Sequence, residues 1–389
     1  MEVVKKISYS RKNERKNGLR FVNMPILLSV LFLSFFGVVM IYSASCYSAE
    51  LTYGDAFFFA RKQLYGVLIG LVCCFLLYKI DYNTLNRFGI AALVISLVLL
   101  ALVFMPGLSR SNYGATRWIA IGSFTIQPSE FAKFGLVVFC AYYIAKKHDK
   151  MHKFKSILPI LGAGGAMCVL IMLEPNMSIT ICVGALMIFM LFIGGARLKH
   201  LLMLGVPILC ALPLLIIAEP YRLKRLLAFL DPWSSAQDEG FQLVQSLYSL
   251  GSGGWFGVGL FNSRQKYLFL PFSESDFIFS IIGEELGLFG CLAIIVVFLV
   301  FIYYGFKVAK NATNRFGSML AGGITFVIAM QVILNIAVVT GSIPPTGLPL
   351  PFISAGGTSI VVFLASIGIL LNIDKQSRLA RERGLVVPK

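Results

Sequence analysis

The residues that could do chemistry are charged side chains beside or inside apolar stretches of this sequence. Asp276 directly precedes an apolar run, and Lys133 enters another run three residues after Glu130. An unpaired ammonium in an apolar region is expensive, so Lys133 needs an acidic neighbour, either Glu130 on the same helix face or Asp276. Each acid also has a structural interpretation: Glu130 suits the positive end of a helix, and Asp276 suits an N-cap.

Two further acids, Glu284 and Glu285, enter the same apolar run as Asp276. If this run is helical, Glu284 lies about 12 Å further along the helix axis than Asp276. We interpret this pair as a polar network that braces helix packing, next to the small residues Gly283 and Gly287, in preference to a catalytic pair.

A third polar element is the run 340–359, which is rich in proline and glycine and is therefore predicted to be stiff and non-helical. Its free backbone amides need partners from protein, water or a ligand. Gly356 and Gly357 would let another backbone or a sugar-phosphate approach closely.

The composition indicates what kind of molecule must position these residues. Of 389 residues, 58% are hydrophobic and 13% are charged, against roughly 45–50% and about 25% in soluble proteins. With a mean hydropathy of +0.82, the chain is predicted to be an all-α polytopic membrane protein. The net charge of +16 is then explained by membrane topology and anionic lipid, and no nucleic-acid partner is expected.

Apolar runs predict about ten transmembrane helices, with a large outer loop, 219–275, between spans 7 and 8. The predicted spans are 24–43, 63–78, 88–105, 130–145, 157–173, 179–193, 201–218, 277–306, 316–339 and 352–373. In the eighth run, 276–285 is expected to form a half-turned or partly solvated segment. The spans make one membrane domain, 24–373, between basic tails at 1–23 and 374–389.

The distribution of charge predicts the orientation of these spans. If the N-terminus is cytoplasmic, 24 of the 34 Lys and Arg residues fall on the cytoplasmic side, as the positive-inside rule requires. Both termini are then cytoplasmic, and the first span is too long to be a cleaved signal. Five cations remain in the outer loop, where they imply an anionic partner, either lipid headgroups or a phosphate or carboxylate substrate.

Several kinds of chemistry are excluded by what the sequence lacks. There is no Gly-Lys dipeptide and hence no Walker-A loop. All three histidines fall in predicted cytoplasmic loops, which excludes imidazole chemistry on the outer face. The eight cysteines have neither metal nor disulfide spacing.

The motifs of the outer segments together resemble the SEDS family (shape, elongation, division and sporulation proteins), which includes FtsW, RodA and SpoVE. The matching blocks are 42–45, 114–119 with 127–133, 221–233, 241–289 and 335–359. The PLPFIS and GG pieces in the last block are highly specific, and the SRQK piece is more similar to FtsW and SpoVE than to RodA.

This chain departs from the family pattern at four positions. Asn176 and Ser178 replace the Asp and Gly of a QPDxGT block, Phe272 replaces the Glu of LPE, and Ala355 replaces a Tyr after PFIS. These departures concern local substrate contacts.

The resemblance implies that the protein polymerises glycan strands from lipid II on the outer face of the bacterial cytoplasmic membrane. Asp276 matches the family's essential acid, and Lys133 and Glu130 match its transmembrane partners. A glycosidase needs a second carboxylate because an alkoxide leaves poorly unless it is protonated. A lipid pyrophosphate leaves without protonation, so one carboxylate together with cations would be enough for this reaction. Asp276 would take the proton from the GlcNAc 4-hydroxyl.

The other implied site residues are candidates for contact with pyrophosphate or sugar: Arg117, Arg222, Lys224, Arg225, Gln245, Arg264, Lys266, Ser354, Gly356, Gly357, Thr358 and Ser359. No metal site is assigned, although a divalent cation, Mg²⁺ or Mn²⁺, could assist. The implied partners are a class B penicillin-binding protein, which is a single-span transpeptidase, and divisome or related wall-synthesis proteins.

Two other functions use the same residues. Buried Glu130, Lys133, Glu284 and Glu285 would also serve a lipid II flippase, and the tails and packing faces would permit a non-catalytic scaffold for a transpeptidase. Clustering of polar features at the outer face favours the enzyme.

Overall fold

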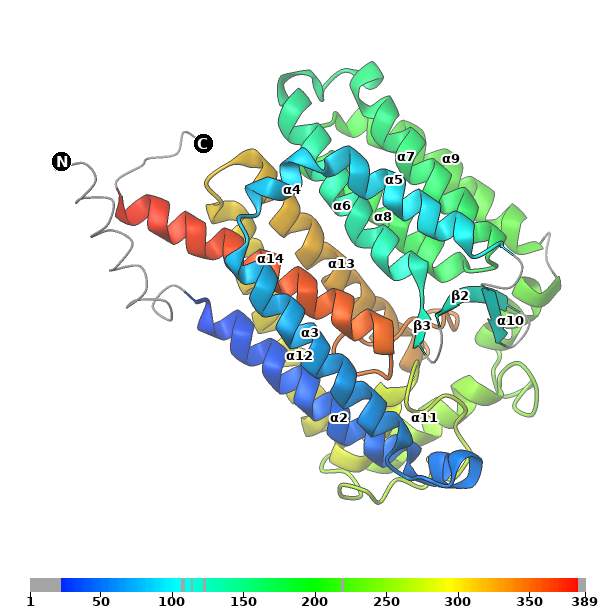
Figure 1. Ribbon diagram of the computed structural model, residues 1–389. Coiled ribbons are helices and arrows are strands. Elements are labelled where there is room, and N and C mark those ends of the chain that lie inside the picture. Colours follow the sequence, from blue (N-terminus) through cyan, green and yellow to red (C-terminus); the bar gives the residue numbers. More distant parts are fainter. Residues whose placement is uncertain (1–21, 106–108, 113–114, 122–123, 218–219, 384–389) are drawn as a thin grey trace.

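The computed structural model describes residues 22–105, 109–112, 115–121, 124–217 and 220–383 (Figure 1). Helices dominate these residues. They are α2 (Met24–Tyr53), α3 (Phe58–Lys79), α4 (Asn83–Arg87), α5 (Gly89–Leu102), α6 (Pro128–Lys147), α7 (Phe154–Leu173), α8 (Met177–Ile193), α9 (Leu198–Ile217), α10 (Pro220–Leu230), α11 (Phe241–Gly253), α12 (Ile278–Asn311), α13 (Arg315–Val339) and α14 (Gly357–Glu382), with a short 3₁₀ turn η1 (His148–Lys150).

Each of the ten predicted spans overlaps one of these helices. Within the described residues, six helices are long and apolar enough to cross a membrane, namely α2, α3, α7, α12, α13 and α14. The chain is therefore an integral membrane protein of helical type, while the count of ten spans stays a prediction. The last span was predicted to start too early, because 352–356 is non-helical and α14 begins at Gly357.

The helices form a bundle in which α2, α3, α12, α13 and α14 lie together on one side and α5 to α9 on the other (Figure 1). Small residues allow α3 and α14 to approach closely. A Cβ on Gly368 would lie 2.3 Å from the Cys74 carbonyl oxygen, and one on Gly70 would lie 2.6 Å from Leu364. Such close backbone approach is how helices associate where lipid provides no hydrophobic driving force.

A small sheet between α5 and α6 makes the prediction of an all-α fold incomplete. Strands β1 (Ser109–Asn112), β2 (Ala115–Ile121) and β3 (Phe124–Ile126) pair antiparallel in the order β1-β2-β3. Ile119 pairs with both Ser109 and Ile126. The segment is too short to give a clear apolar alternation, yet it positions Arg117 on the central strand.

Residues 276–277 form a turn in which Asp276 is half-buried, as expected for the half-turned entry to this span. Residues 278–285 are helical and buried, so the expectation of a partly solvated segment was wrong there. The helix breaks at Gly287, where φ is 67° and ψ is −167°. This conformation requires glycine, and the Trp255–Gly257 backbone lies so close that a Cβ would clash. The backbone of the preceding loop also bonds to the break, since Val258 N–H donates to the Glu284 carbonyl.

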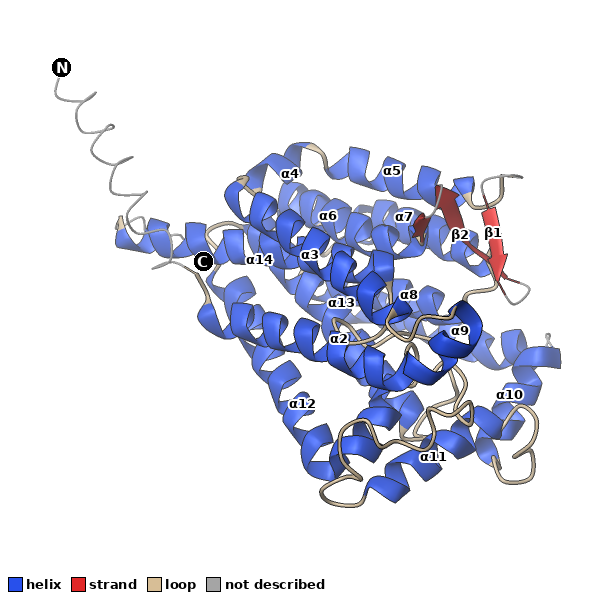
Figure 2. Ribbon diagram, turned by 60° about the horizontal axis from the view of Figure 1, so that its bottom comes forward, coloured by secondary structure: helices blue, strands red, loops and turns tan. Residues whose placement is uncertain are grey.

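The predicted outer loop contains two helices, α10 and α11, and lies with the sheet at one end of the bundle (Figures 1 and 2). The start of α2 and the end of α14 lie at the opposite end. The predicted tail 374–389 begins within α14, which continues to Glu382. Of the predicted tail 1–23, residues 1–21 lie outside the described residues.

Candidate active site at the sheet end of the bundle

The backbone of Glu274, Ser275 and Asp276 is held at three consecutive carbonyl groups. Ala355 N–H donates to the Glu274 carbonyl at 2.9 Å, and Ser354 Oγ donates to the Ser275 carbonyl at 2.6 Å. Asn335 Nδ2 donates to the Asp276 carbonyl at 2.8 Å. These donors come from α13 and the loop before α14, so two distant parts of the chain fix the position of Asp276.

The loop between α13 and α14 is itself held in place by the same residues. Asn335 Nδ2 also donates to the Leu348 carbonyl at 2.7 Å, and Leu350 N–H donates to Ser354 Oγ at 2.8 Å. Gly347 has φ of 68°, and a Cβ there would lie 3.3 Å from Asp276 Oδ2. The glycine thus provides the turn that brings the loop against the carboxylate.

The Asp276 carboxylate has few direct partners. Phe277, not Asp276, is the N-cap of α12, and that cap has no side-chain hydrogen bond, so the N-cap interpretation fails. Ser275 Oγ donates to Asp276 Oδ1 at 2.8 Å. Burial raises the pKa of Asp276, while the Ser275 hydroxyl and then the charges of Arg117 and Arg225 lower it. The side chain is thus a carboxylate with a raised pKa in the field of two guanidinium groups.

Arg117 links this carboxylate to the turn between α7 and α8. Its Nε donates to the Glu174 carbonyl at 3.2 Å and its Nη2 to the Pro175 carbonyl at 2.5 Å. Glu174 is fully buried, and within the described part of the chain neither carboxylate oxygen has a hydrogen-bond partner. Burial raises the pKa of Glu174 to about 8, although the positive charge of Arg117 opposes the shift.

Lys133 finds its acidic neighbour in Glu130 and not in Asp276. Its Nζ lies 2.8 Å from Glu130 Oε1 and donates to Gln331 Oε1 at 2.8 Å, and the Lys133 and Glu130 side chains are at most 1% exposed. Gln331 and Asn335 are one turn apart on α13, about 6 Å along the axis. The helix thus connects the buried ion pair to the backbone of Asp276 without a direct contact between Lys133 and Asp276.

Glu284 and Glu285 form the brace that was expected. Glu284 accepts from Ser263 Oγ, from Ser249 Oγ at 3.3 Å and from the Arg264 and Gln265 amides at 2.9 and 3.4 Å. Glu285 Oε1 accepts from Ser43 Oγ at 2.5 Å and from the Ser263 amide at 3.2 Å. The two acids thereby fasten the loop before Asp276 to α12 and α2.

Lys266 belongs to this brace. It is 4% exposed, its Nζ donates to the Phe261 carbonyl, and it lies 3.8 Å from Glu285 Oε1. Its charge is therefore already balanced inside the protein. Arg264, which precedes it by two residues, is exposed.

The remaining predicted contact residues are distributed over α10, α11 and the start of α14. Arg225 is half-buried, 4.0 Å from Glu239, and Lys224 is exposed. The side chain of Arg222 lies outside the described residues. Gln245 is half-buried on α11.

Polar residues at the start of α14 bind neighbouring backbone. Gly356 N–H donates to Gln63 Oε1 at 3.2 Å, and Thr358 Oγ1 donates to the Thr125 carbonyl of β3 at 2.7 Å. Ser359 Oγ donates to the Gly356 carbonyl at 3.1 Å. The start of α14 is thus tied to α3 and to the sheet, and Gly357 is its first residue.

Besides Ser275, four residues of the site were not among the predicted ones. Gln331 and Asn335 have a sequence signal, since polar side chains four residues apart inside an apolar helix mark a buried polar face. Glu174 and Glu274 have none, because their burial depends on distant segments. Burial raises the pKa of Glu274, and the neighbouring Asp276 carboxylate raises it further.

We searched the described part of the chain for side chains that could bind a metal ion. In that part, no group of three or more His, Cys, Asp or Glu side chains is placed so as to hold an ion. The carboxylate and the guanidinium groups are the charged groups that this site offers to a substrate.

Sequence comparisons relate the chain to named proteins. Residues 24–379 match the model of the FtsW, RodA and SpoVE family, described as "Cell cycle protein". The chain is 40% identical over 358 residues to stage V sporulation protein E of Bacillus subtilis (strain 168), covering 92% of this chain and 98% of that one. It is 37% identical over 357 residues to a probable peptidoglycan glycosyltransferase FtsW of Geobacter sp. (strain M18), covering 92% and 97%.

The fold is similar to that of two solved structures. One, described as "Structural coordination of polymerization and crosslinking by a peptidoglycan synthase complex", contains a chain with a TM-score of 0.77 and 24% identity, covering 92% of this chain and 98% of that one. The other is the Thermus thermophilus rod shape determining protein RodA, with a TM-score of 0.68 and 24% identity, covering 91% and 97%. This chain belongs to the cell cycle protein family of FtsW, RodA and SpoVE.

Proposed function

We propose that this protein is a peptidoglycan glycosyltransferase that polymerises lipid II into β-1,4 glycan strands. The printed names of several relatives, each a probable peptidoglycan glycosyltransferase FtsW, support this activity. The reaction would take place at the outer face of the bacterial cytoplasmic membrane, with both termini in the cytoplasm, as the charge distribution predicts.

The observation that carries the proposal is the way in which Asp276 is held. Hydrogen bonds fix its own carbonyl and those of the two residues before it. Among the described residues, Ser275 is the one hydrogen-bond donor to its carboxylate. A side chain that is positioned by its backbone but not saturated with donors retains acceptor capacity for a substrate hydroxyl. Its raised pKa improves it as a base near neutral pH.

In the proposed reaction, Asp276 accepts the proton of the GlcNAc 4-hydroxyl of incoming lipid II. The hydroxyl oxygen attacks C1 of the lipid-linked sugar of the growing chain from the face opposite to the leaving group. The bond from C1 to the pyrophosphate oxygen breaks, the configuration inverts from α to β, and undecaprenyl pyrophosphate leaves with the bonding electrons.

Cations are needed where negative charge develops on the pyrophosphate. Arg117 and Arg225 are the two whose charge acts on Asp276, and we assign them this role first. Exposed Lys224 and Arg264 are available for more distant phosphate contacts, whereas buried Lys266 is better suited to holding its own loop. Assistance by Mg²⁺ or Mn²⁺ stays a prediction.

Lys133 and Glu130 have a positioning role in this proposal. Their ion pair holds Gln331 on α13, one turn from Asn335, which bonds to the Asp276 backbone. We also propose that the protein works beside a class B penicillin-binding protein and other wall-synthesis proteins. A structural relative described as part of a peptidoglycan synthase complex supports such a partner.

The test compares Asp276→Asn with the matched control Asp238→Asn, which changes an exposed acid of the same outer segment. Purified protein in detergent, with its transpeptidase partner, is supplied with lipid II, and glycan strands are separated by length. We expect a loss of at least about 100-fold for Asp276→Asn and normal strands for the control. Near-normal activity of Asp276→Asn would remove this residue from the chemistry.

The same assay separates the two other functions. A flippase moves its substrate between two compartments and makes no glycan in detergent. A scaffold makes no glycan either in detergent or in sealed vesicles. The wild-type protein is also assayed with a transpeptidase partner whose own active site is inactivated. Glycan strands formed in that mixture must be made by this chain.

A further inference from the structure

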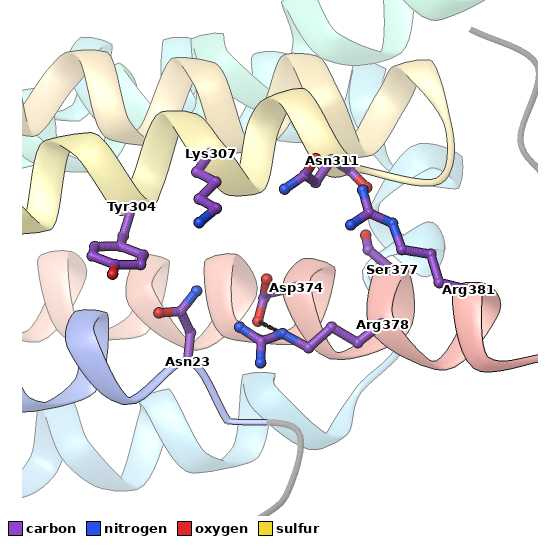
Figure 3. Close-up of a pocket in the computed structure, with 8 residues that line it drawn as sticks. All are labelled: Asn23, Tyr304, Lys307, Asn311, Asp374, Ser377, Arg378 and Arg381. Carbon is purple, nitrogen blue, oxygen red and sulfur yellow. Dashed lines mark hydrogen bonds and ion pairs between the residues drawn. The ribbon is translucent and has the colours of Figure 1, made fainter.

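A cavity of about 270 Å³ lies at the end of the bundle opposite to Asp276. It is bounded by the beginning of α2 and the last turns of α12 and α14 (Figure 3). The eight residues that line it all carry polar or charged groups, namely Asn23, Tyr304, Lys307, Asn311, Asp374, Ser377, Arg378 and Arg381. None of these residues takes part in the site around Asp276.

The cavity carries an excess of positive charge. Arg378 Nε lies 2.7 Å from Asp374 Oδ2, so this pair is balanced. Lys307 and Arg381 remain, and both are exposed and extend toward the cavity (Figure 3). Arg381 donates to the Asn311 carbonyl at 3.4 Å, which holds its guanidinium at the rim. An anion bound here would meet two cations that Asp374 does not neutralise.

The cavity also offers hydrogen-bond acceptors. Asn23 is 3% exposed, and its Oδ1 has no hydrogen-bond partner among the residues that the structure describes. Its side chain does not cap α2, although it occupies the N-cap position. A buried amide oxygen without a partner is unfavourable unless a donor fills the site. The Asn23 amide and the Asp374 carboxylate therefore call for a ligand with hydroxyl groups as well as negative charge.

The depth of the cavity matches the headgroup level of a bilayer. From Gly287 to its end at Asn311, α12 runs about 36 Å, slightly more than the hydrocarbon core of about 30 Å. Tyr303 and Tyr304 lie at this end, and Lys307 Nζ is 5.3 Å from the Tyr304 ring centre. Tyrosines with a neighbouring lysine are typical of the membrane interface. The volume suits a headgroup, with acyl chains remaining outside.

We propose that this cavity binds a phosphodiester or phosphomonoester that carries hydroxyl groups, the chemistry of a glycerophosphate. Lys307 and Arg381 would hold the phosphate, and Asn23 and Asp374 would accept from the hydroxyls. The ligand is either the headgroup of an anionic lipid or a free glycerophosphate. This inference does not rest on the proposed function, because no residue is shared between the two sites.

The test is native mass spectrometry of the full chain in detergent, with added phosphatidylglycerol, phosphatidylcholine or free glycerol phosphate. We expect phosphatidylglycerol to remain bound where phosphatidylcholine is lost. The double variant Lys307→Gln with Arg381→Gln should weaken that binding about tenfold or more. The charge-matched control Lys310→Gln with Lys375→Gln, two basic residues at the same end that do not line the cavity, should retain it.

The arms of the experiment separate the two sources of the ligand. Competition by free glycerol phosphate at similar concentration identifies a soluble ligand, and its failure to compete identifies the lipid headgroup. Equal loss of phosphatidylglycerol in both double variants would overturn the proposal, because it would mean attraction by total charge alone. Equal retention of phosphatidylglycerol and phosphatidylcholine by the wild-type protein would overturn it as well.

Discussion

Two groups of acids lie within ten residues of each other at the start of α12, and the protein treats them in opposite ways. Asn335 donates to the Asp276 carbonyl, and Ala355 and Ser354 hold the two residues before it. The Asp276 carboxylate accepts from Ser275. Glu284 and Glu285 instead have carboxylates that accept from several donors in the loop before Asp276, and they are at most 2% exposed.

The difference separates an acid that braces the fold from one that keeps acceptor capacity. A carboxylate with four donors has little acceptor capacity left, and its removal leaves those donors unpaired. A carboxylate that is poorly hydrogen-bonded but rigidly placed adds little to stability, because burial opposes its charge. Stability and activity should therefore separate cleanly between Glu284 and Asp276.

The largest effect on stability is expected from Glu284→Ala. The change leaves Ser263 and the Arg264 amide without this acceptor. An unpaired buried donor costs about 1–3 kcal/mol, so the free energy of unfolding should fall by about 2–6 kcal/mol. Thermal unfolding in detergent measures it, with the exposed acid substitution Glu50→Ala as control. Asp276→Ala should leave the unfolding temperature within the range of that control. A stable Glu284→Ala protein would break the comparison.

The next effect concerns how Asp276 is placed. Asn335→Leu removes the donor to the Asp276 carbonyl, and a displacement of about 1 Å at a reacting group lowers the rate about 100-fold. We expect kcat to fall about 10–100-fold while lipid II binding is retained. Asn372→Leu is the matched control, because Asn372 Nδ2 likewise donates to a part-buried backbone carbonyl, that of Tyr78 at 2.7 Å, at the other end of the bundle. Equal activity of the two variants would refute the positioning role.

Glu174 is a third kind of acid, buried with no donor at either carboxylate oxygen. The pKa of its carboxyl is about 8 in the folded protein and about 4.3 when unfolded. The stability that its proton confers is therefore fully present below about pH 4 and is lost as the pH rises through about 8. Glu174→Gln should remove up to about 1.4 kcal/mol of pH dependence per pH unit in that window. The unfolding temperatures of the wild-type and Glu174→Gln proteins, measured between about pH 4 and pH 8, test this. If the two temperatures changed with pH in the same way, Glu174 would not have the raised pKa.

The smallest effect is expected from Ser275→Ala. The Ser275 hydroxyl lowers the pKa of Asp276, so its removal should raise that pKa further. Because the proposed reaction needs the carboxylate, the acidic limb of the pH–rate profile should move to higher pH. Ser342→Ala, on an exposed outer hydroxyl, is the control. A shift to lower pH would contradict the assignment of Asp276 as the base.

The long helices could be predicted from the sequence because an apolar run of sufficient length has few alternatives in a chain of this composition. The runs at 157–173 and 179–193 match the ends of α7 and α8 closely. The sheet at 109–126 and the break at Gly287 could not be predicted in this way. Both depend on contacts with distant backbone, such as that of Gly257 at the break.

The candidate site was predictable by residue type but not by geometry. Asp276, Arg117 and Lys133 stand out because charge beside an apolar run is rare. Their pairing does not follow from spacing, and Lys133 bonds to Gln331, which lies 198 positions away in the chain. The role of Asn335 depends on a carbonyl 59 positions away, which no local pattern indicates.

The central claim is that the Asp276 carboxylate receives the proton of the attacking sugar hydroxyl. The most direct measurement is a structure of the Asp276→Asn protein with unreacted lipid II, in which the substitution prevents turnover. We expect the GlcNAc 4-hydroxyl to lie within about 3.2 Å of the side chain at position 276. A well-ordered hydroxyl bound instead to Glu174 or Glu274, with position 276 turned away from the sugar, would contradict it.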